Sequence, residues 1–188
     1  GNPNIDQLAK KVARTLEEQI ENLSSIASAF SSFAKMPKAH NEIINMNELL
    51  KSISDLFARQ ENTIVTFTTG SESPFVFADK NQMVSVFNNL VKNAIQSIPE
   101  HRKGFVDVHI KDEDGWIAVT VSDNGSGIPK ENYDKVFVPN FTTKSSGTGL
   151  GLAITKQMID GAGGRIWFES AENVGTTFYV RLKKNEIV

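Results

Sequence analysis

Four short segments rich in asparagine, glycine and threonine follow one another between residues 88 and 152, and their order restricts what this chain can fold into. They read Asn-Asn-Leu-Val-Lys-Asn at 88–93, Asp-Asn-Gly-Ser-Gly at 123–127, Phe-Thr-Thr-Lys at 141–144 and Gly-Thr-Gly-Leu-Gly-Leu at 147–152. Each segment alone is weak evidence, because asparagine-glycine turns and glycine hinges are common. In this order, with these gaps, they predict one ATP pocket that is closed by a mobile lid.

The length and composition fit one globular domain with an appendage. The chain has 188 residues, of which 39% are hydrophobic, and this is enough for a core. Its net charge of −2 gives no electrostatic reason to expect nucleic acid as a partner. The absence of cysteine excludes disulfides and thiolate chemistry and fits a reducing cytoplasm. No apolar run approaches the roughly 18–20 residues that cross a bilayer, so we expect a cytoplasmic location, with any membrane anchor outside this sequence.

The first part of the chain has the hydrophobic pattern of one long helix. Apolar residues recur at steps of three or four from Ile5 to Ala34, as one helical face requires. The predicted helix spans about 4–35, and Pro37 stops it. It would be roughly 48 Å long. Such a helix packs either on its own domain or in a bundle, and its length favours the bundle, so 1–37 is expected to be a bundle segment.

The rest of the chain changes to a mixed pattern of helices and strands. We expect a linker at 38–45 and a domain at 46–188. Helices are predicted from Asn47, as the N-cap, to about Gln60, over 79–98 and over 149–159, with a short helical piece at 132–136. Alternating apolar residues predict strands at 64–69, 75–78, 106–111, 116–122, 165–170 and 176–182, with Asp114-Gly115 as a hairpin turn. Strands with one apolar face and three helices predict a two-layer α/β sandwich.

Asn89 and Asn93 are four residues apart on the predicted helix 79–98, so they share one face. Asparagine on the wet side of a helix is common, and that alternative stays open for an isolated pair. An asparagine carbonyl oxygen is also a ligand of the kind that Mg²⁺ prefers, with water and phosphate oxygens as its other ligands. The pair is therefore a candidate for a magnesium and nucleotide contact.

Asp123 follows the predicted strand 116–122 and opens a glycine-rich turn. If it stood alone, this segment would be an ordinary turn. A carboxylate at a strand end can also accept the exocyclic amine of adenine, and glycines let the backbone lie close to the base. We therefore expect the nucleotide to contact Asp123, Gly125, Gly127 and Ile128.

The stretch 130–147 is rich in loop residues and is either a surface loop or a lid over the triphosphate. In the lid interpretation its phenylalanines anchor it, and Lys144 offers charge to phosphate oxygens. The glycines that follow open a helix, whose N-terminal N–H groups can bind anions. The expected nucleotide contacts are Phe141, Thr142, Thr143, Lys144, Gly147, Thr148, Gly149, Leu150 and Gly151.

On these motifs, the region from about Ile43 to Leu182 resembles the catalytic ATP-binding domain of two-component sensor histidine kinases. That domain belongs to a wider group with gyrase B, the Hsp90 chaperones and the MutL proteins. The resemblance implies a Bergerat-type ATP-binding fold, assigns Asn93 to Mg²⁺ and Asn89 to nearby polar contacts, and places Thr176 near adenine. It also implies roles for Asn93 and Lys144 in phosphoryl transfer. ATPases of the group carry a water-activating Glu where this chain has Asn89, which favours phosphoryl transfer over rapid hydrolysis.

The chain departs from a complete kinase of this type in its N-terminal segment. Such kinases have two bundle helices, and the first carries the phosphoacceptor histidine. Here 1–37 resembles only the second dimerisation and histidine-phosphotransfer helix, and it contains no histidine. The expected partners are therefore ATP, a histidine outside this sequence, a response-regulator receiver domain and a second subunit that dimerises through this helix. Two alternatives stay open, namely a serine kinase of the anti-sigma-factor type and an ATPase clamp.

Overall fold

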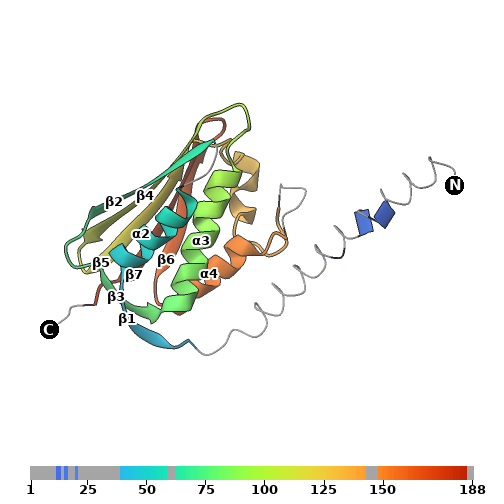
Figure 1. Cartoon of the computed structure of the whole chain (residues 1–188). Helices are drawn as coiled ribbons and strands as arrows, with labels where there is room; N and C mark the ends of the chain where they lie inside the picture. The colour runs from blue at the N-terminus through green and yellow to red at the C-terminus, as the bar shows by residue number, and fades with distance from the viewer. Residues whose placement is uncertain are drawn as a thin grey trace, which may run out of the picture.

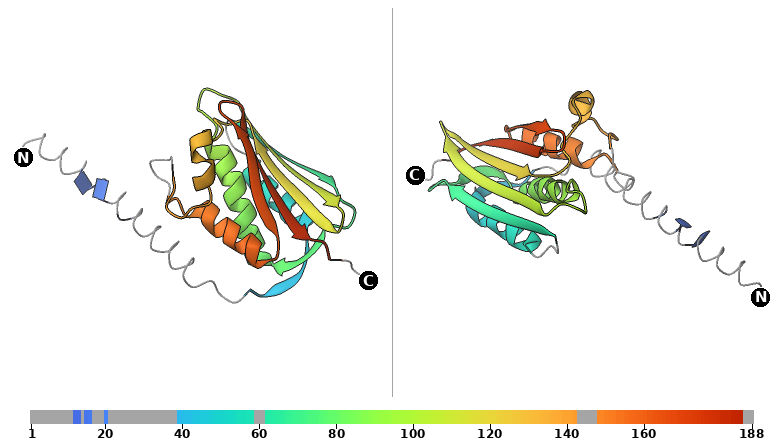
Figure 2. Two further views of the ribbon diagram at one scale, coloured as in Figure 1. Left: turned by 180° about the vertical axis from the view of Figure 1, so that it is seen from behind. Right: turned by 90° about the horizontal axis from the view of Figure 1, so that it is seen from above.

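The computed structural model describes residues 12, 13, 15, 16, 20, 39–58, 62–142 and 148–185. Helices are interspersed with single strands and pairs of strands along the chain, and the elements form two layers, with a large sheet on one side and the helices on the other (Figures 1 and 2). The predicted two-layer α/β sandwich is therefore confirmed. The predicted helix over 4–35 lies largely outside the described residues, of which 12, 13, 15, 16 and 20 are helical. None of the helices in the described ranges has the length and apolar content that crossing a bilayer requires.

The large sheet has five strands in the order β2-β4-β5-β7-β6. The strands β2 and β4 are parallel, and the other neighbours are antiparallel. The bounds are β2 Thr63–Gly70, β4 Gly104–Glu113, β5 Trp116–Asp123, β6 Arg165–Ala171 and β7 Gly175–Lys183. Each lies within about two residues of its predicted range. The β4–β5 turn has positive φ at Asp114 and Gly115, which is the conformation that an Asp-Gly hairpin turn adopts.

A second sheet of two strands pairs β1 (Asn41–Asn45) with β3 (Phe75–Asp79). The prediction of a linker at 38–45 was therefore wrong for residues 41–45. The pairing also separates β3 from β2, because these two consecutive strands belong to different sheets. Five residues with a single buried position give too little alternation for a strand to be read from sequence, and the paired residues of the partner strand lie 30 to 38 positions away.

Three helices cover the inner face of the large sheet in the described part of the chain: α2 (Met46–Phe57), α3 (Lys80–Gln96) and α4 (Gly151–Gly161). A short 3₁₀ helix, η1 (Lys130–Lys135), lies near the predicted helical piece at 132–136. The long helix α3 lies centrally, against both α2 and α4 (Figure 1). Its core-facing residues are almost fully buried and include Met83, Val86, Phe87, Leu90 and Val91.

The N-cap of α2 is Asn45, so the prediction of Asn47 was wrong. The Asn45 side chain accepts from the backbone N–H groups of Asn47 and Glu48. Pairing of β1 with β3 keeps Asn45 extended, which is the backbone conformation that an N-cap needs. Asn47 then lies in the first turn, where its side chain donates to the Ser71 carbonyl and accepts from Thr69 Oγ1. It ties the helix to the end of β2.

Candidate functional site

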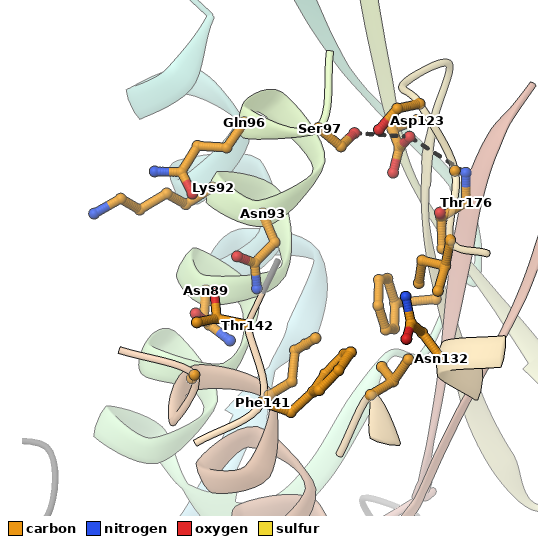
Figure 3. A pocket seen from close by; sticks show the side chains of 18 of the residues that line it. Asn89, Lys92, Asn93, Gln96, Ser97, Asp123, Asn132, Phe141, Thr142 and Thr176 are labelled. Carbon is orange, nitrogen blue, oxygen red and sulfur yellow. Dashed lines mark hydrogen bonds between the residues drawn. The ribbon is translucent and has the colours of Figure 1, made fainter. Parts of the chain in front are cut away.

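A cavity of about 770 Å³ lies between α3, the start of α4 and the ends of β5 and β7. Figure 3 shows Asn93 pointing from α3 toward the space in front of Asp123 and Thr176, whereas Lys92 and Gln96 extend away from its centre. The described lining residues are Asn89, Lys92, Asn93, Gln96, Ser97, Asp123, Ser126, Gly127, Ile128, Pro129, Asn132, Val136, Phe141, Thr142, Thr148, Gly149, Gly151, Leu152, Thr176 and Phe178.

One wall of the cavity is a polar stripe on α3. Its members are Asn89, Lys92, Asn93, Gln96 and Ser97, which follow one another at steps of three and one and so share a helical face. Residues 86, 87, 90, 91 and 94 occupy the opposite face, in the core. The same helix therefore anchors the fold and presents amide, ammonium and hydroxyl groups to the cavity.

Asp123 lies at the far end of the cavity, where β5 stops. Its Oδ1 accepts three hydrogen bonds, from Ser97 Oγ at 3.0 Å, from the Gly125 N–H at 2.8 Å and from the Thr176 N–H at 3.2 Å. Donors from α3, from the turn and from β7 thus fix the carboxylate. Position 125 must be glycine for this arrangement, because a Cβ there would lie 1.9 Å from Ser97 Oγ.

Asn89 joins α3 to the start of α4. Its Nδ2 donates to Thr155 Oγ1 at 3.0 Å, and Thr155 is almost completely buried. A Cβ at Gly151, the first residue of α4, would lie 2.5 Å from Asn89 Oδ1. The close approach puts the free N–H groups of the α4 N-terminus beside the polar stripe, where an anion can use both.

Most of the predicted contact residues meet at this cavity. Asn89, Asn93, Asp123, Gly127, Ile128, Phe141, Thr142, Thr148, Gly149, Gly151 and Thr176 line it. Gly125 and Leu150 were predicted as contacts and do not line it: Gly125 makes room for Ser97, and Leu150 is 2% exposed and packs inward. Thr143, Lys144 and Gly147 lie outside the described residues, so their predicted contacts stay predictions.

Several residues that line the cavity were not predicted from the sequence. Lys92, Gln96 and Ser97 could have been found, because they are in helical register with Asn89 and Asn93. Ser126, Pro129 and Asn132 surround predicted residues of the turn and the short helix. Val136, Leu152 and Phe178 have no local signal that separates a cavity wall from a core position. They become visible only once the sheet and α4 are assembled.

Asp79 sets the position of α3 without entering the cavity. As the N-cap, its side chain accepts from the Gln82 N–H, and it also accepts from the His40 N–H at 2.8 Å. The Gln82 and His40 hydrogen bonds hold the pKa of Asp79 below its usual value, because both favour the carboxylate. The start of the helix that carries Asn89 and Asn93 is thereby tied to the segment before β1.

Residues 78–186, more than half of the chain, match the family described as histidine kinase-, DNA gyrase B- and HSP90-like ATPase. The chain belongs to this family. The matched region runs from the end of β3 through β7 and contains every described residue that lines the cavity. Family membership identifies ATP as the nucleotide of this domain and confirms the resemblance that the motifs indicated.

Similar proteins within this family are sensor kinases. Sensor histidine kinase ZraS of Escherichia coli K12 is 30% identical over 180 residues, which are 94% of this chain and 38% of ZraS. The chain thus spans less than half of that relative. A structure of the catalytic domain of histidine kinase ThkA has a TM-score of 0.69 and 38% identity, and the match covers 77% of this chain and 96% of that one. A structure of ThkA in complex with response regulator protein TrrA has a TM-score of 0.77 and 31% identity, covering 94% and 52%.

Proposed function

We propose that this chain is the ATP-binding catalytic part of a sensor histidine kinase and transfers the γ-phosphoryl group to a histidine outside this sequence. One observation carries the proposal. Among the described residues that line the cavity, Asp123 is the only acid, and three hydrogen bonds hold it at the end away from Asn89 and α4. The Asn89 amide lies beside the expected position of the phosphates, and an amide cannot take a proton from water. A nucleophile must therefore come from another part of the kinase.

The nucleotide is oriented by the two ends of the cavity. Asp123 accepts the adenine amine, with Thr176 beside it on β7. The triphosphate runs along α3, past Asn93 and Asn89, toward the N–H groups at the start of α4. Lys92 at the rim and Lys144 of the lid supply positive charge. These groups position the γ-phosphoryl group and neutralise its charge, which is the main work of catalysis in phosphoryl transfer.

The donor set of the stripe fits Mg²⁺. No cluster of three or more His, Asp or Glu side chains that could hold a metal occurs among the described residues. Asn93 lines the cavity and offers a single amide oxygen, and Mg²⁺ commonly takes one or two protein oxygens together with waters and phosphate oxygens. Asn93 would hold the ion, and Asn89 would support it. When bound, Mg²⁺ supplies charge neutralisation at the phosphates.

The transfer step forms a bond between an imidazole nitrogen and the γ-phosphorus while the bond from that phosphorus to the bridging oxygen of ADP breaks. ADP leaves, and the phosphohistidine would pass its phosphoryl group to an aspartate of a response regulator. The complex of the similar kinase ThkA with a response regulator protein supports this partner class. A homodimer built through an N-terminal helix is supported by Val12, Leu16 and Ile20, which are helical and at least half exposed. The absence of cysteine fits a cytoplasmic location.

Transfer in trans tests the proposal. The chain is incubated with γ-labelled ATP and Mg²⁺, with and without the segment of its parent protein that carries the acceptor histidine. We expect acid-labile label on the added segment only, and its loss in Asn93→Ala. Asn81→Ala is the matched control, since it lies exposed on the same helix and does not line the cavity. Label on the isolated chain at the rate of the intact kinase, or release of phosphate that ignores the acceptor, would contradict the proposal.

A further inference from the structure

Arg102 lies outside the cavity lining, in the loop between α3 and β4, yet its side chain reaches the turn that follows Asp123. Its Nη1 donates to the carbonyl oxygen of Asn124 at 2.6 Å and to that of Gly125 at 2.8 Å. A guanidinium nitrogen of this kind carries two hydrogens, so it can serve both acceptors at once. These bonds join two stretches of chain that are more than 20 residues apart.

The two carbonyls belong to consecutive peptide units. The N–H group of each unit donates a hydrogen bond at the end of the cavity that we assign to adenine. The N–H of the 124–125 plane is that of Gly125, which donates to Asp123 Oδ1 at 2.8 Å. The N–H of the 125–126 plane is that of Ser126, which donates to the Ser97 carbonyl at 2.9 Å. Because a peptide unit is rigid and planar, a donor that fixes its oxygen also fixes the direction of its N–H.

Ser97 connects the second of these peptide units to the carboxylate, since its Oγ donates to Asp123 Oδ1 at 3.0 Å. The guanidinium therefore acts on the carboxylate along two routes, through the Gly125 N–H and through Ser97. Its positive charge also polarises both peptide units, which makes their N–H groups stronger donors. A neutral side chain at 102 would leave the geometry of the turn less restricted and its donors weaker.

The main chain around Arg102 is held without help from the guanidinium. The Asn62 side chain donates to the carbonyls of Glu100 and Arg102, and the Arg102 N–H donates to the Pro99 carbonyl. The turn has further anchors, because the Asn124 side chain donates to the Lys103 carbonyl and accepts from the Phe105 N–H. Loss of the Arg102 side chain should consequently leave its own loop and the turn after Asp123 folded. It should change the direction of the N–H groups of the two peptide units.

We propose that Arg102 is a positioning residue that sets the direction of the Asp123 carboxylate and thereby the preference of the cavity for adenine. This inference rests on the role of Asp123 in the proposed function. Replacing a charged donor to two carbonyls should weaken ATP binding about tenfold, in line with the energy of charge-assisted hydrogen bonds. GTP binding should change less, because guanine has an oxygen in place of the exocyclic amine that adenine would donate to the Asp123 carboxylate.

The experiment measures ATP and GTP dissociation constants for the complete chain by calorimetry in Mg²⁺. Arg102→Met keeps the aliphatic stem and removes the donors, Arg102→Lys restores a charged donor, and Lys103→Ala removes a charge from the same loop. We expect Arg102→Met to lose about tenfold for ATP and less for GTP, Arg102→Lys to recover part of the loss, and Lys103→Ala to stay within about twofold of the parent chain.

Asp123→Ala separates this inference from the proposed function. If Asp123→Ala leaves the preference for ATP over GTP intact, the assignment of Asp123 fails, and the role of Arg102 fails with it. If Asp123→Ala loses the preference but Arg102→Met keeps it, only the inference about Arg102 is overturned. The inference about Arg102 would also be overturned if Arg102→Met lost equal affinity for ATP and GTP, or if it lost its cooperative thermal transition. Either result would mean that Arg102 only stabilises the fold.

Discussion

Replacing Gly125 by alanine places a methyl group where the structure has no room for one. The added Cβ would lie 1.9 Å from Ser97 Oγ, 2.8 Å from Ser97 Cβ and 2.8 Å from Asp123 Oδ1. An ordinary contact begins near 3.4 Å, so the turn and the end of α3 must separate by about 1.5 Å, the difference between 3.4 Å and 1.9 Å. Ser97 Oγ and Asp123 Oδ1 are now 3.0 Å apart, and a movement of that size would break their hydrogen bond.

The cost follows from the bonds that the movement removes. A hydrogen bond to a charged group contributes about 1.5–3 kcal/mol, and the Gly125 N–H bond to the same oxygen is weakened as well. Since about 1.4 kcal/mol is tenfold in affinity, ATP binding in Gly125→Ala should fall between roughly tenfold and a hundredfold. The turn is held separately by Asn124 and Arg102, so most of the loss should appear in binding rather than in the melting temperature.

Titration calorimetry with ATP and Mg²⁺, beside thermal unfolding of the free protein, measures both effects. Gly161→Ala is the matched control, because a Cβ at the end of α4 meets nothing within 4 Å and alanine is the better helix former. That variant should bind like the parent chain and be no less stable. ATP binding by Gly125→Ala within twofold of the parent chain would refute the dependence of binding on the hydrogen bond between Ser97 Oγ and Asp123 Oδ1.

Two further predictions concern stability. Asp79→Ala should lower the free energy of unfolding by about 1 kcal/mol at neutral pH, because it removes the cap of α3. The folded pKa of Asp79 is lowered from 3.8, so this stabilisation is complete above that value and is lost as pH falls through the folded pKa. Urea titrations at pH 7 and pH 3 should show that the difference in unfolding free energy between Asp79→Ala and the parent chain shrinks in acid. An unchanged difference would refute this prediction. Phe87→Ala should lower the free energy of unfolding by about 3–5 kcal/mol, since Phe87 is 0% exposed. Leu56→Ala, at 69% exposure, should change it by less than about 0.5 kcal/mol, and similar losses for both in urea unfolding would contradict the described core.

The strongly patterned elements could be predicted from the sequence because their local signals agree with their tertiary roles. The alternation in β4 and β5, with Asp-Gly between them, is both a hairpin signal and a buried face. The pairing of β6 with β7 sets Trp167 opposite Tyr179, and the two rings stack with their centres 5.2 Å apart. Asn93 and Asp123 were placed correctly at one cavity because motif order reflects the order of helix and strand around it.

The errors arise where tertiary pairing decides between local alternatives. Asn45 and Asn47 are both good caps, and only the pairing of β1 with β3 selects Asn45. The nucleotide contacts predicted for Gly125 and Leu150 stay predictions, and the roles that the structure shows for these residues are to admit Ser97 and to fill the core. Arg102 has no motif at all, since its importance comes from reaching a turn more than 20 residues away.

A crystal structure of the chain with a non-hydrolysable ATP analogue and Mg²⁺ tests the central claim most directly. We expect the adenine amine within hydrogen-bond distance of the Asp123 carboxylate, the metal ion on Asn93 Oδ1 and the phosphates at the start of α4. An adenine turned away from Asp123, or a metal ion held by residues other than the polar stripe of α3, would contradict it.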